Sequence, residues 1–331
     1  YLMHTSTSPQ YAIIASCDVA GAMMEPPGGT ALVESSILEA LDFRRAMKKI
    51  DAEWGDDWWF QVWGPDHFSE EGIGSREDWF LHDKDDWHGF GNLEPNFNML
   101  DPIKVTIITP GLSLKGEFSK IGIPAAVLTK YLAEHGIIVE KCGLYSLLTM
   151  FTIGITKGRW NTLLTALQQF KDDYDKNQLI SRIIPEFVSA NRRKNMHYER
   201  LGLRDLCQQV HETYKLYDVA RLTTETYLSN IKPAMKPSDA FAKMAHREID
   251  RIPINQLEGR ITAILLTPYP PGIPLLIPGE LFNKTIVDYL KFVRLFNEKF
   301  PGFETDVHGL IRREVNEKYD YFVDCVRQKK S

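Results

Sequence analysis

The stretch Ile103-Lys104-Val105-Thr106-Ile107-Ile108-Thr109 is the clearest strand in the sequence, and Pro110-Gly111 closes it. Aliphatic β-branched residues favour a strand, and a Pro-Gly pair favours the turn that ends one. Residues 123–135 follow with the apolar spacing of an amphipathic helix, which Gly136 is suited to end. This strand and helix are the start of a mixed domain.

Further strands and helices are expected on both sides of this pair. On the C-terminal side the apolar pattern predicts strands over residues 137–141 and 145–153 and a helix over residues 156–171. On the N-terminal side it predicts helices over residues 11–24 and 34–50, separated by a Pro-Gly breaker at residues 25–29, and a strand over residues 58–63. The order of strand, helix, two strands and helix indicates a small α+β domain with one face of its sheet covered.

A third section begins near residue 175. Its pattern predicts helices near residues 204–216, 237–247 and 285–298, and strands near residues 261–266 and 319–325. The fold class expected for the whole chain is α/β, with α+β character in the middle and C-terminal parts.

Composition sets the class of protein. The 331 residues are 44% hydrophobic and 25% charged, which is ordinary for a soluble globular protein with a large core. A net charge of -5 gives no basic footprint for nucleic acid, and no apolar run approaches the roughly 20 residues of a membrane helix. Four dispersed cysteines and nine scattered histidines form none of the usual zinc motifs. We expect a cytoplasmic protein without a metal, a nucleic-acid partner or a membrane segment.

A run of hydroxyl residues, Thr5-Ser6-Thr7-Ser8, stands just before the first expected helix. Short hydroxyls and backbone N–H groups at a helix start can hold an anion. The same pattern also suits an ordinary helix cap, with Ser8 as the capping residue. The first residue is Tyr1 rather than Met, so we expect the chain to be the later part of a longer polypeptide.

Several short motifs are more specific than fold propensity requires. They are Met3-His4-Thr5-Ser6-Thr7-Ser8-Pro9-Gln10-Tyr11, Leu100 to Val105 with Thr109-Pro110-Gly111, Pro268 to Pro274 with Pro278-Gly279-Glu280, Trp87-His88-Gly89-Phe90, and Pro301-Gly302-Phe303-Glu304-Thr305-Asp306. With these motifs in order along the whole chain, the sequence resembles the bacterial Orn/Lys/Arg decarboxylases. Those are fold-type-I enzymes that use pyridoxal 5'-phosphate, and the pattern is closest to the constitutive lysine-specific members of pseudomonads.

The resemblance implies three parts. Residues 1–50 would be the end of the large cofactor-binding domain with a linking helix, residues 51–175 the small domain, and residues 176–331 the C-terminal domain. The lysine that forms the Schiff base with the cofactor would lie upstream of Tyr1, so no catalytic residue is expected in this chain. The resemblance also implies a homodimer with active sites at its interface, and a higher oligomer such as a decamer as the larger alternative.

The resemblance also assigns two sets of binding residues. Ser6, Thr7 and Ser8 would contact the cofactor phosphate, reaching the partner subunit's site across the dimer interface. Glu140 would meet the distal cation of a basic amino acid. Lysine-specific members carry glutamate in this Val-Glu-Lys context, which makes lysine the preferred substrate. A compact ammonium suits one or two carboxylate oxygens, whereas a planar guanidinium favours acceptors arranged in a differently shaped fork.

Other interpretations of these residues stay open. Glu140 also fits an exposed strand end paired with Lys141 or with water. Arginine and then ornithine are the alternative substrates. A catalytically inactive paralogue, or a regulatory partner without the cofactor lysine, is the alternative from another class of protein.

Overall fold

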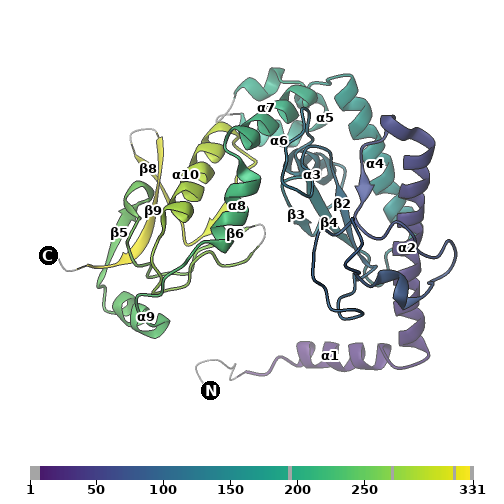
Figure 1. Cartoon of the computed structure of the whole chain (residues 1–331), viewed down its shortest axis with the longest axis horizontal. Coiled ribbons are helices and arrows are strands. Elements are labelled where there is room, and N and C mark those ends of the chain that lie inside the picture. Colours follow the sequence, from purple (N-terminus) through teal and green to yellow (C-terminus); the bar gives the residue numbers. More distant parts are fainter. Residues whose placement is uncertain (1–7, 193–195, 270–271, 316–317, 329–331) are drawn as a thin grey trace. The chain divides into compact units, whose positions relative to one another are not determined.

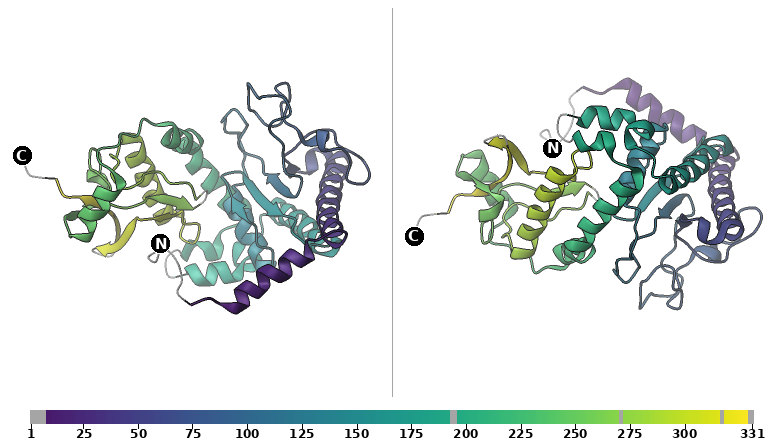
Figure 2. Two further views of the ribbon diagram at one scale, coloured as in Figure 1. Left: turned by 90° about the horizontal axis from the view of Figure 1, so that it is seen from below. Right: turned by 90° about the horizontal axis from the view of Figure 1, so that it is seen from above.

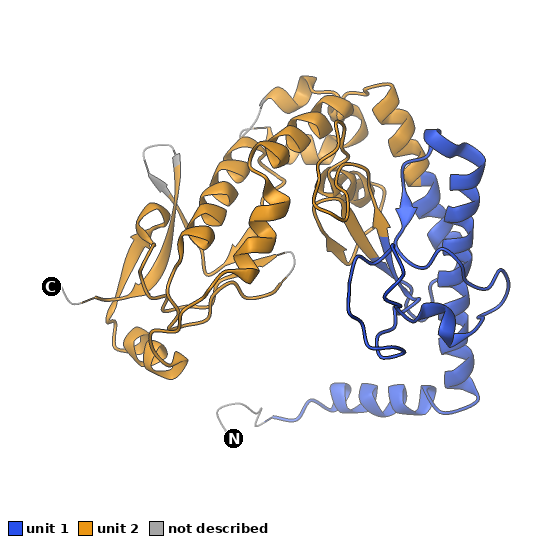
Figure 3. Cartoon of the chain, viewed as in Figure 1, with its two compact units in different colours: residues 1–106, 149–165 blue, residues 107–148, 166–331 orange. Residues whose placement is uncertain are grey.

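The computed structural model describes residues 8–192, 196–269, 272–315 and 318–328. The chain divides into two compact units, which are coloured separately in Figure 3. Unit 1 consists of Tyr1–Thr106 and Thr149–Thr165, and unit 2 of Ile107–Leu148 and Ala166–Ser331. Each unit is described by itself below.

Unit 1 begins with two helices, α1 (Tyr11–Met23) and α2 (Gly28–Trp54). The expected start of the second helix near residue 34 is wrong, because α2 begins directly after Pro27. The amide of Gly29 donates to the Glu25 carbonyl at 2.9 Å, and the amide of Ala31 donates to the Pro27 carbonyl at 3.1 Å. Helical hydrogen bonds therefore resume directly after the prolines, and the Pro-Gly breaker separates α1 from α2 by only a few residues.

The apolar face of α2 supplies the core of unit 1. Phe43 is fully buried, and its ring centroid lies 5.4 Å from that of Phe151 and 6.0 Å from that of Trp160. The Trp160 indole also donates to Glu39 at 2.6 Å, which ties the start of α4 (Lys157–Asp175) to α2. The acidic segment over residues 65–98 contains the short helix η2 (Arg76–Trp79) and is otherwise mostly loop.

A four-stranded sheet has the order β1-β2-β4-β3, and the boundary between the units passes within β2 and β4. Its strands are β1 (Gln61–Val62), β2 (Lys104–Ile108), β3 (Lys141–Cys142) and β4 (Ser146–Met150). β2 agrees with the predicted strand, but the strand expected over residues 137–141 is wrong for all but its last residue. Gly136 has a positive φ of 74° and the Ile137 amide bonds back to the Leu132 carbonyl at 2.9 Å, so these residues cap the preceding helix instead.

Unit 2 contains helices that were predicted to within a few residues and others that were not. The first set is α3 (Ala125–Glu134), α7 (Leu203–Leu216), α9 (Pro237–Ala245) and α10 (Lys284–Lys299). The second is α5 (Ile180–Ile183), α6 (Pro185–Asn191), η3 (Met196–Arg200), α8 (Val219–Leu228) and η4 (Ile254–Gln256). Helices α8 and α10 pack side by side, as Figures 1 and 2 show from three directions.

The C-terminal part of unit 2 adds a three-stranded antiparallel sheet of order β5-β9-β8 and a two-stranded ribbon, β6-β7. The strands are β5 (Ile249–Pro253), β6 (Thr267–Tyr269), β7 (Asp306–His308), β8 (Ile311–Val315) and β9 (Lys318–Val326). β9 confirms the predicted last strand. The strand expected over residues 261–266 is wrong, because a bend at residues 263–264 leaves only isolated bridges, from Ile261 and Leu266 to residues 281 and 276 and from Thr262 to Cys325.

Candidate functional site

The predicted phosphate contacts lie at the start of unit 1. Ser6 and Thr7 are outside the described residues, whereas Ser8 is described and exposed. The interpretation of Ser8 as the helix cap is wrong, because Gln10 is the N-cap of α1 and its carbonyl accepts the amides of Ile13 and Ile14 at 3.0 and 3.1 Å. A serine hydroxyl close to the positive end of a helix dipole is a donor set that fits a phosphate.

Glu140 lies in unit 2, directly before β3. Its amide donates to the Leu148 carbonyl at 2.8 Å, and the register then pairs Lys141 with Leu148 and Cys142 with Leu147. The hairpin therefore fixes the backbone at Glu140, while the side chain is exposed. The exposed carboxylate is solvated, so it needs no cation to offset burial.

The proline-rich motif begins within β6, which contains Pro268 and Tyr269. Pro270 and Pro271 are outside the described residues. Tyr269 is half exposed, with its ring centroid 4.6 Å from that of His308 on β7. Glu280 accepts the amide of Ile277 at 2.8 Å, so its carboxylate closes the turn that follows the motif. These contacts give the motif a clear structural role.

The Leu100–Val105 motif is also structural in its contacts. The Asp101 carboxylate accepts the amide of Ile103 at 3.2 Å, and the Asp101 carbonyl accepts the amide of Lys104 at 3.1 Å. These bonds make the tight turn from which β2 starts. These contacts give Asp101 a structural role in the turn.

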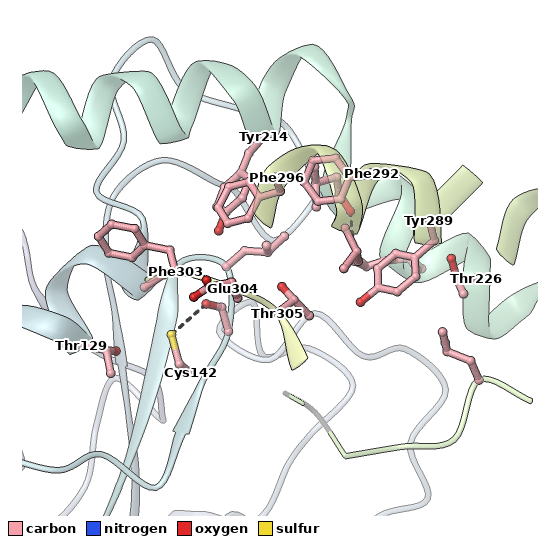
Figure 4. Close-up of a pocket in the computed structure, with 18 of the residues that line it drawn as sticks. Thr129, Cys142, Tyr214, Thr226, Tyr289, Phe292, Phe296, Phe303, Glu304 and Thr305 are labelled. Atoms are coloured by element: carbon pink, nitrogen blue, oxygen red, sulfur yellow. Dashed lines mark hydrogen bonds between the residues drawn. The ribbon is translucent and has the colours of Figure 1, made fainter. Parts of the chain in front are cut away.

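A cavity of about 480 Å³ in unit 2 was missed by sequence reasoning, although one of the motifs above lines it. Figure 4 shows the motif residues Phe303, Glu304 and Thr305 together with aromatic side chains of α7 and α10 and with Cys142 of β3. The motif was the only signal of this cavity in the sequence, because the other lining residues come from segments up to about 180 residues away. Spacing along the chain does not show that such distant residues lie close together.

No group of three or more His, Cys, Asp or Glu side chains among the described residues is placed to hold a metal ion. None of the described helices has both the length and the apolar character to cross a membrane.

Comparison with protein families gives two matches that follow each other along the chain. Residues 1–159 match the Orn/Lys/Arg decarboxylase major domain, and residues 220–327 match the Orn/Lys/Arg decarboxylase C-terminal domain. The motifs quoted above fall within these two segments.

Several curated proteins are similar over nearly the whole chain. Lysine decarboxylase LdcA of Pseudomonas aeruginosa is 45% identical over 332 residues, covering 99% of this chain and 44% of that protein. The inducible lysine decarboxylase of Escherichia coli is 40% identical over 95% of this chain and 43% of its own length. The biodegradative arginine decarboxylase of Escherichia coli is 34% identical. The chain thus spans less than half the length of these relatives.

Solved structures agree with the sequence matches. Lysine decarboxylase A from Pseudomonas aeruginosa superposes with a TM-score of 0.91 at 46% identity, covering 98% of this chain and 44% of that one. The constitutive lysine decarboxylase of Escherichia coli gives a TM-score of 0.88 at 36% identity, covering 98% of this chain and 45% of that one. Two family models match the chain, relatives align with nearly its whole length, and a solved relative has the same fold. This chain therefore belongs to the Orn/Lys/Arg decarboxylase family.

Proposed function

We propose that the protein decarboxylates a basic amino acid, L-lysine, to the diamine cadaverine and CO₂, with pyridoxal 5'-phosphate as cofactor. The order of similarity carries the proposal: identity falls from 45% with a lysine decarboxylase to 34% with an arginine decarboxylase and 27% with an ornithine decarboxylase. The chain spans about 44% of the first of these relatives, so the activity is proposed for the whole protein, with the cofactor lysine outside this chain.

Glu140 is the proposed partner of the substrate's distal ammonium. Its backbone is held by the Leu148 carbonyl and its carboxylate is exposed, so the side chain can meet a ligand without moving the hairpin. An ammonium is compact and makes good contacts with one carboxylate, which favours lysine over the planar guanidinium of arginine. The role proposed for Glu140 is binding and orientation of the substrate.

The substrate proposal is tested with the full-length protein by measuring CO₂ release from lysine, arginine and ornithine separately. We expect lysine to give the highest kcat/KM, and Glu140→Gln to lower that value by about 100-fold, because a charge-assisted contact is lost. Glu117→Gln is the matched control, since Glu117 is an exposed carboxylate of the same unit. A wild-type preference for arginine, or an unchanged kcat/KM in Glu140→Gln, would contradict the assignment.

Ser6, Thr7 and Ser8 are the proposed contacts to the cofactor phosphate, made across the interface of a homodimer. Pyridoxal phosphate, when bound, supplies the electron sink that decarboxylation needs. The hydroxyls of this chain would hold the phosphate, and the nearby end of α1 adds the favourable field of a helix N-terminus.

The phosphate proposal is tested by cofactor retention. Ser8→Ala is expected to raise the dissociation constant of pyridoxal phosphate by about tenfold, and the Ser6, Thr7 and Ser8 triple alanine variant by more. Ser16→Ala is the control, because the Ser16 hydroxyl bonds only within α1, to the Ile13 carbonyl at 2.7 Å. Cofactor absorbance after dialysis measures both, and light scattering measures the dimer or the larger oligomer. Equal retention in all variants would remove these residues from the site.

The alternative of an inactive paralogue or regulatory partner is decided by the same assays. A full-length protein that neither retains pyridoxal phosphate nor releases CO₂ from any of the three amino acids would favour that alternative over the enzyme.

A further inference from the structure

Helix α1 is apolar around its whole circumference. Successive residues of a helix are about 100° apart around its axis. With that spacing, Tyr11, Ile13, Ile14, Val19 and Met23 face different sides and together surround the helix. An amphipathic helix would instead gather such residues into one stripe. α1 therefore has no continuous polar face to turn toward water.

These apolar side chains are nevertheless exposed. Tyr11 is 79% exposed, Ile13 60% and Val19 57%, and no residue of α1 is buried by the described part of the chain. The neighbouring helix α2 differs, because Phe43 and Met47 on it are buried in the core of unit 1. A helix that is apolar all round is normally buried on all sides. We therefore expect a further surface to cover α1.

The turn between the two helices fixes the direction of α1. The Met24 amide donates to the Ala20 carbonyl at 3.1 Å, and the first helical bond beyond the turn forms at Gly29. Gly29 is buried, and a Cβ there would lie 2.1 Å from the Met24 carbonyl oxygen. Figure 1 shows α1 leaving the start of α2 at this turn. Because the backbones are in such close contact, α1 is presented in one direction instead of folding back onto α2.

Unit 1 has a second exposed apolar surface. A groove of about 780 Å³ is lined by Val33 of α2, Trp79 of η2, and Met99 and Ile153 of the loops beside the sheet. Val33 and Met99 are each 41% exposed, and Ile153 is 47% exposed. Exposed apolar patches of this kind mark surfaces that contact other protein. The lack of cover is thus not confined to α1.

The comparisons indicate where the cover comes from. The chain covers 44% of the length of LdcA of Pseudomonas aeruginosa, so more than half of that relative has no counterpart here. Both α1 and the groove belong to residues 1–159, which match the family's major domain, whereas the C-terminal domain match reaches residue 327. A further part of the full-length protein would therefore stand ahead of α1, where it can complete the domain to which α1 belongs.

We infer that the part of the full-length polypeptide that precedes Tyr1 packs around α1 and buries it together with the Cys17 thiol. The 13 residues of α1 are about 20 Å long, shorter than the roughly 30 Å core of a bilayer, so protein is the cover that fits. Asp18 is the one charged residue of α1, so the covering surface is apolar with a basic or N–H group opposite Asp18.

The first test is the reactivity of Cys17 in the full-length protein, which does not depend on the proposed decarboxylation. Cys17 is exposed in this chain, so an uncovered α1 would let it react freely. We expect N-ethylmaleimide to label Cys17 at least about 100-fold more slowly in the native protein than in urea, followed by mass spectrometry. Lys49→Cys, at an exposed position of α2, is the control and should react at similar rates in both. Native labelling of Cys17 as fast as that of the Lys49→Cys thiol would overturn the inference.

A cross-link identifies the covering surface. Tyr11 is replaced by the photoreactive p-benzoylphenylalanine, which keeps an aromatic ring at this exposed position. After irradiation of the full-length protein, we expect a product of monomer mass in which Tyr11 is joined to a peptide from the sequence ahead of Tyr1. A product of dimer mass, a cross-link to unit 2, or no cross-link to protein would each overturn the inference.

A substitution measures the same burial through stability. Val19→Asp would place a second carboxylate against the apolar cover, and we expect the midpoint of thermal unfolding of the full-length protein to fall by about 4 °C or more. Lys49→Asp introduces the same side chain at an exposed helix position and should shift the midpoint by less than about 1 °C. Equal midpoints for Val19→Asp and the wild type would overturn the inference. If Val19→Asp fails to fold, the labelling of the wild-type protein still decides.

Discussion

Two buried side chains that carry nitrogen, Arg44 in unit 1 and His211 in unit 2, find their hydrogen-bond partners in different ways. In unit 1, Arg44 is only 2% exposed. Its Nε donates to the Pro102 carbonyl at 3.2 Å, its Nη1 to the Trp63 carbonyl at 3.0 Å and its Nη2 to the Lys104 carbonyl at 3.1 Å. The guanidinium thus joins α2 to three points of the chain around the start of β2.

In unit 2, His211 of α7 is fully buried. Its Nε2 is 3.0 Å from the Ser119 carbonyl, and its Nδ1 is 2.6 Å from the Tyr145 hydroxyl. A carbonyl oxygen only accepts, so Nε2 carries the hydrogen and Nδ1 accepts from Tyr145. This arrangement needs no charge.

The Arg44 guanidinium and the His211 imidazole need different surroundings. Burial lowers the pKa of Arg44 to about 10, with Asp101 acting in the opposite direction, so the guanidinium keeps its charge at neutral pH and needs several carbonyl dipoles. His211 needs only one donor and one acceptor, but it needs close packing. A Cβ on Gly122 would lie 2.1 Å from its Nδ1. Hydrogen bonds to several carbonyls therefore matter most at Arg44, and close packing matters most at His211.

Arg44→Met removes the hydrogen bonds of the buried guanidinium in unit 1 and should have the largest effect on stability. It leaves three carbonyls without their donor, and we expect it to lower the free energy of unfolding by about 3–5 kcal/mol. Lys49→Met on the same helix is the control, because the Lys49 side chain is exposed and its loss should change stability by less than about 0.5 kcal/mol. Denaturant unfolding measures both. Equal free energies of unfolding for the wild type and Arg44→Met would mean that the three hydrogen bonds to carbonyls make no net contribution to stability.

Gly122→Ala tests the demand for shape in unit 2. The added methyl group would collide with the His211 ring, and we expect a loss of about 2–4 kcal/mol. Gly158→Ala is the matched control, since its Cβ would meet nothing closer than the Thr156 hydroxyl at 4.0 Å, and in a helix it should be neutral or slightly stabilising. Thermal unfolding compares them, and a tolerated Gly122→Ala would refute the close-packing account.

Tyr145→Phe removes the hydroxyl that His211 accepts, and should cost about 1–2 kcal/mol at neutral pH. Burial raises the pKa of Tyr145 above its ordinary value of 10.0. The unfolded chain therefore loses this proton first, so the contribution is present below about pH 10 and is lost as the pH rises above it. The variant should show a shallower loss of stability above pH 10 than the wild type, measured by unfolding at several pH values. Parallel profiles would contradict this.

The local sequence pattern was enough to predict the long helices and the strands β2 and β9. The apolar spacing of α3 and α10 and the β-branched run of β2 are visible in the sequence because each element buries one face over its whole length. Residues 261–266 look like a strand for the same reason, yet a bend at residues 263–264 reduces their pairing to isolated bridges. Short elements such as α5 and β6 have too few residues to show a period.

The sequence by itself determined the family, the α/β class and the residues proposed to bind phosphate and substrate, because motifs and periodicity are properties of neighbouring residues. Only the tertiary structure decided that Glu140 is exposed, that Gln10 and not Ser8 caps α1, and that Phe303 and Glu304 share a cavity with side chains of α7 and α10. Burial, capping geometry and cavity walls depend on contacts between distant segments, and no spacing along the chain encodes them.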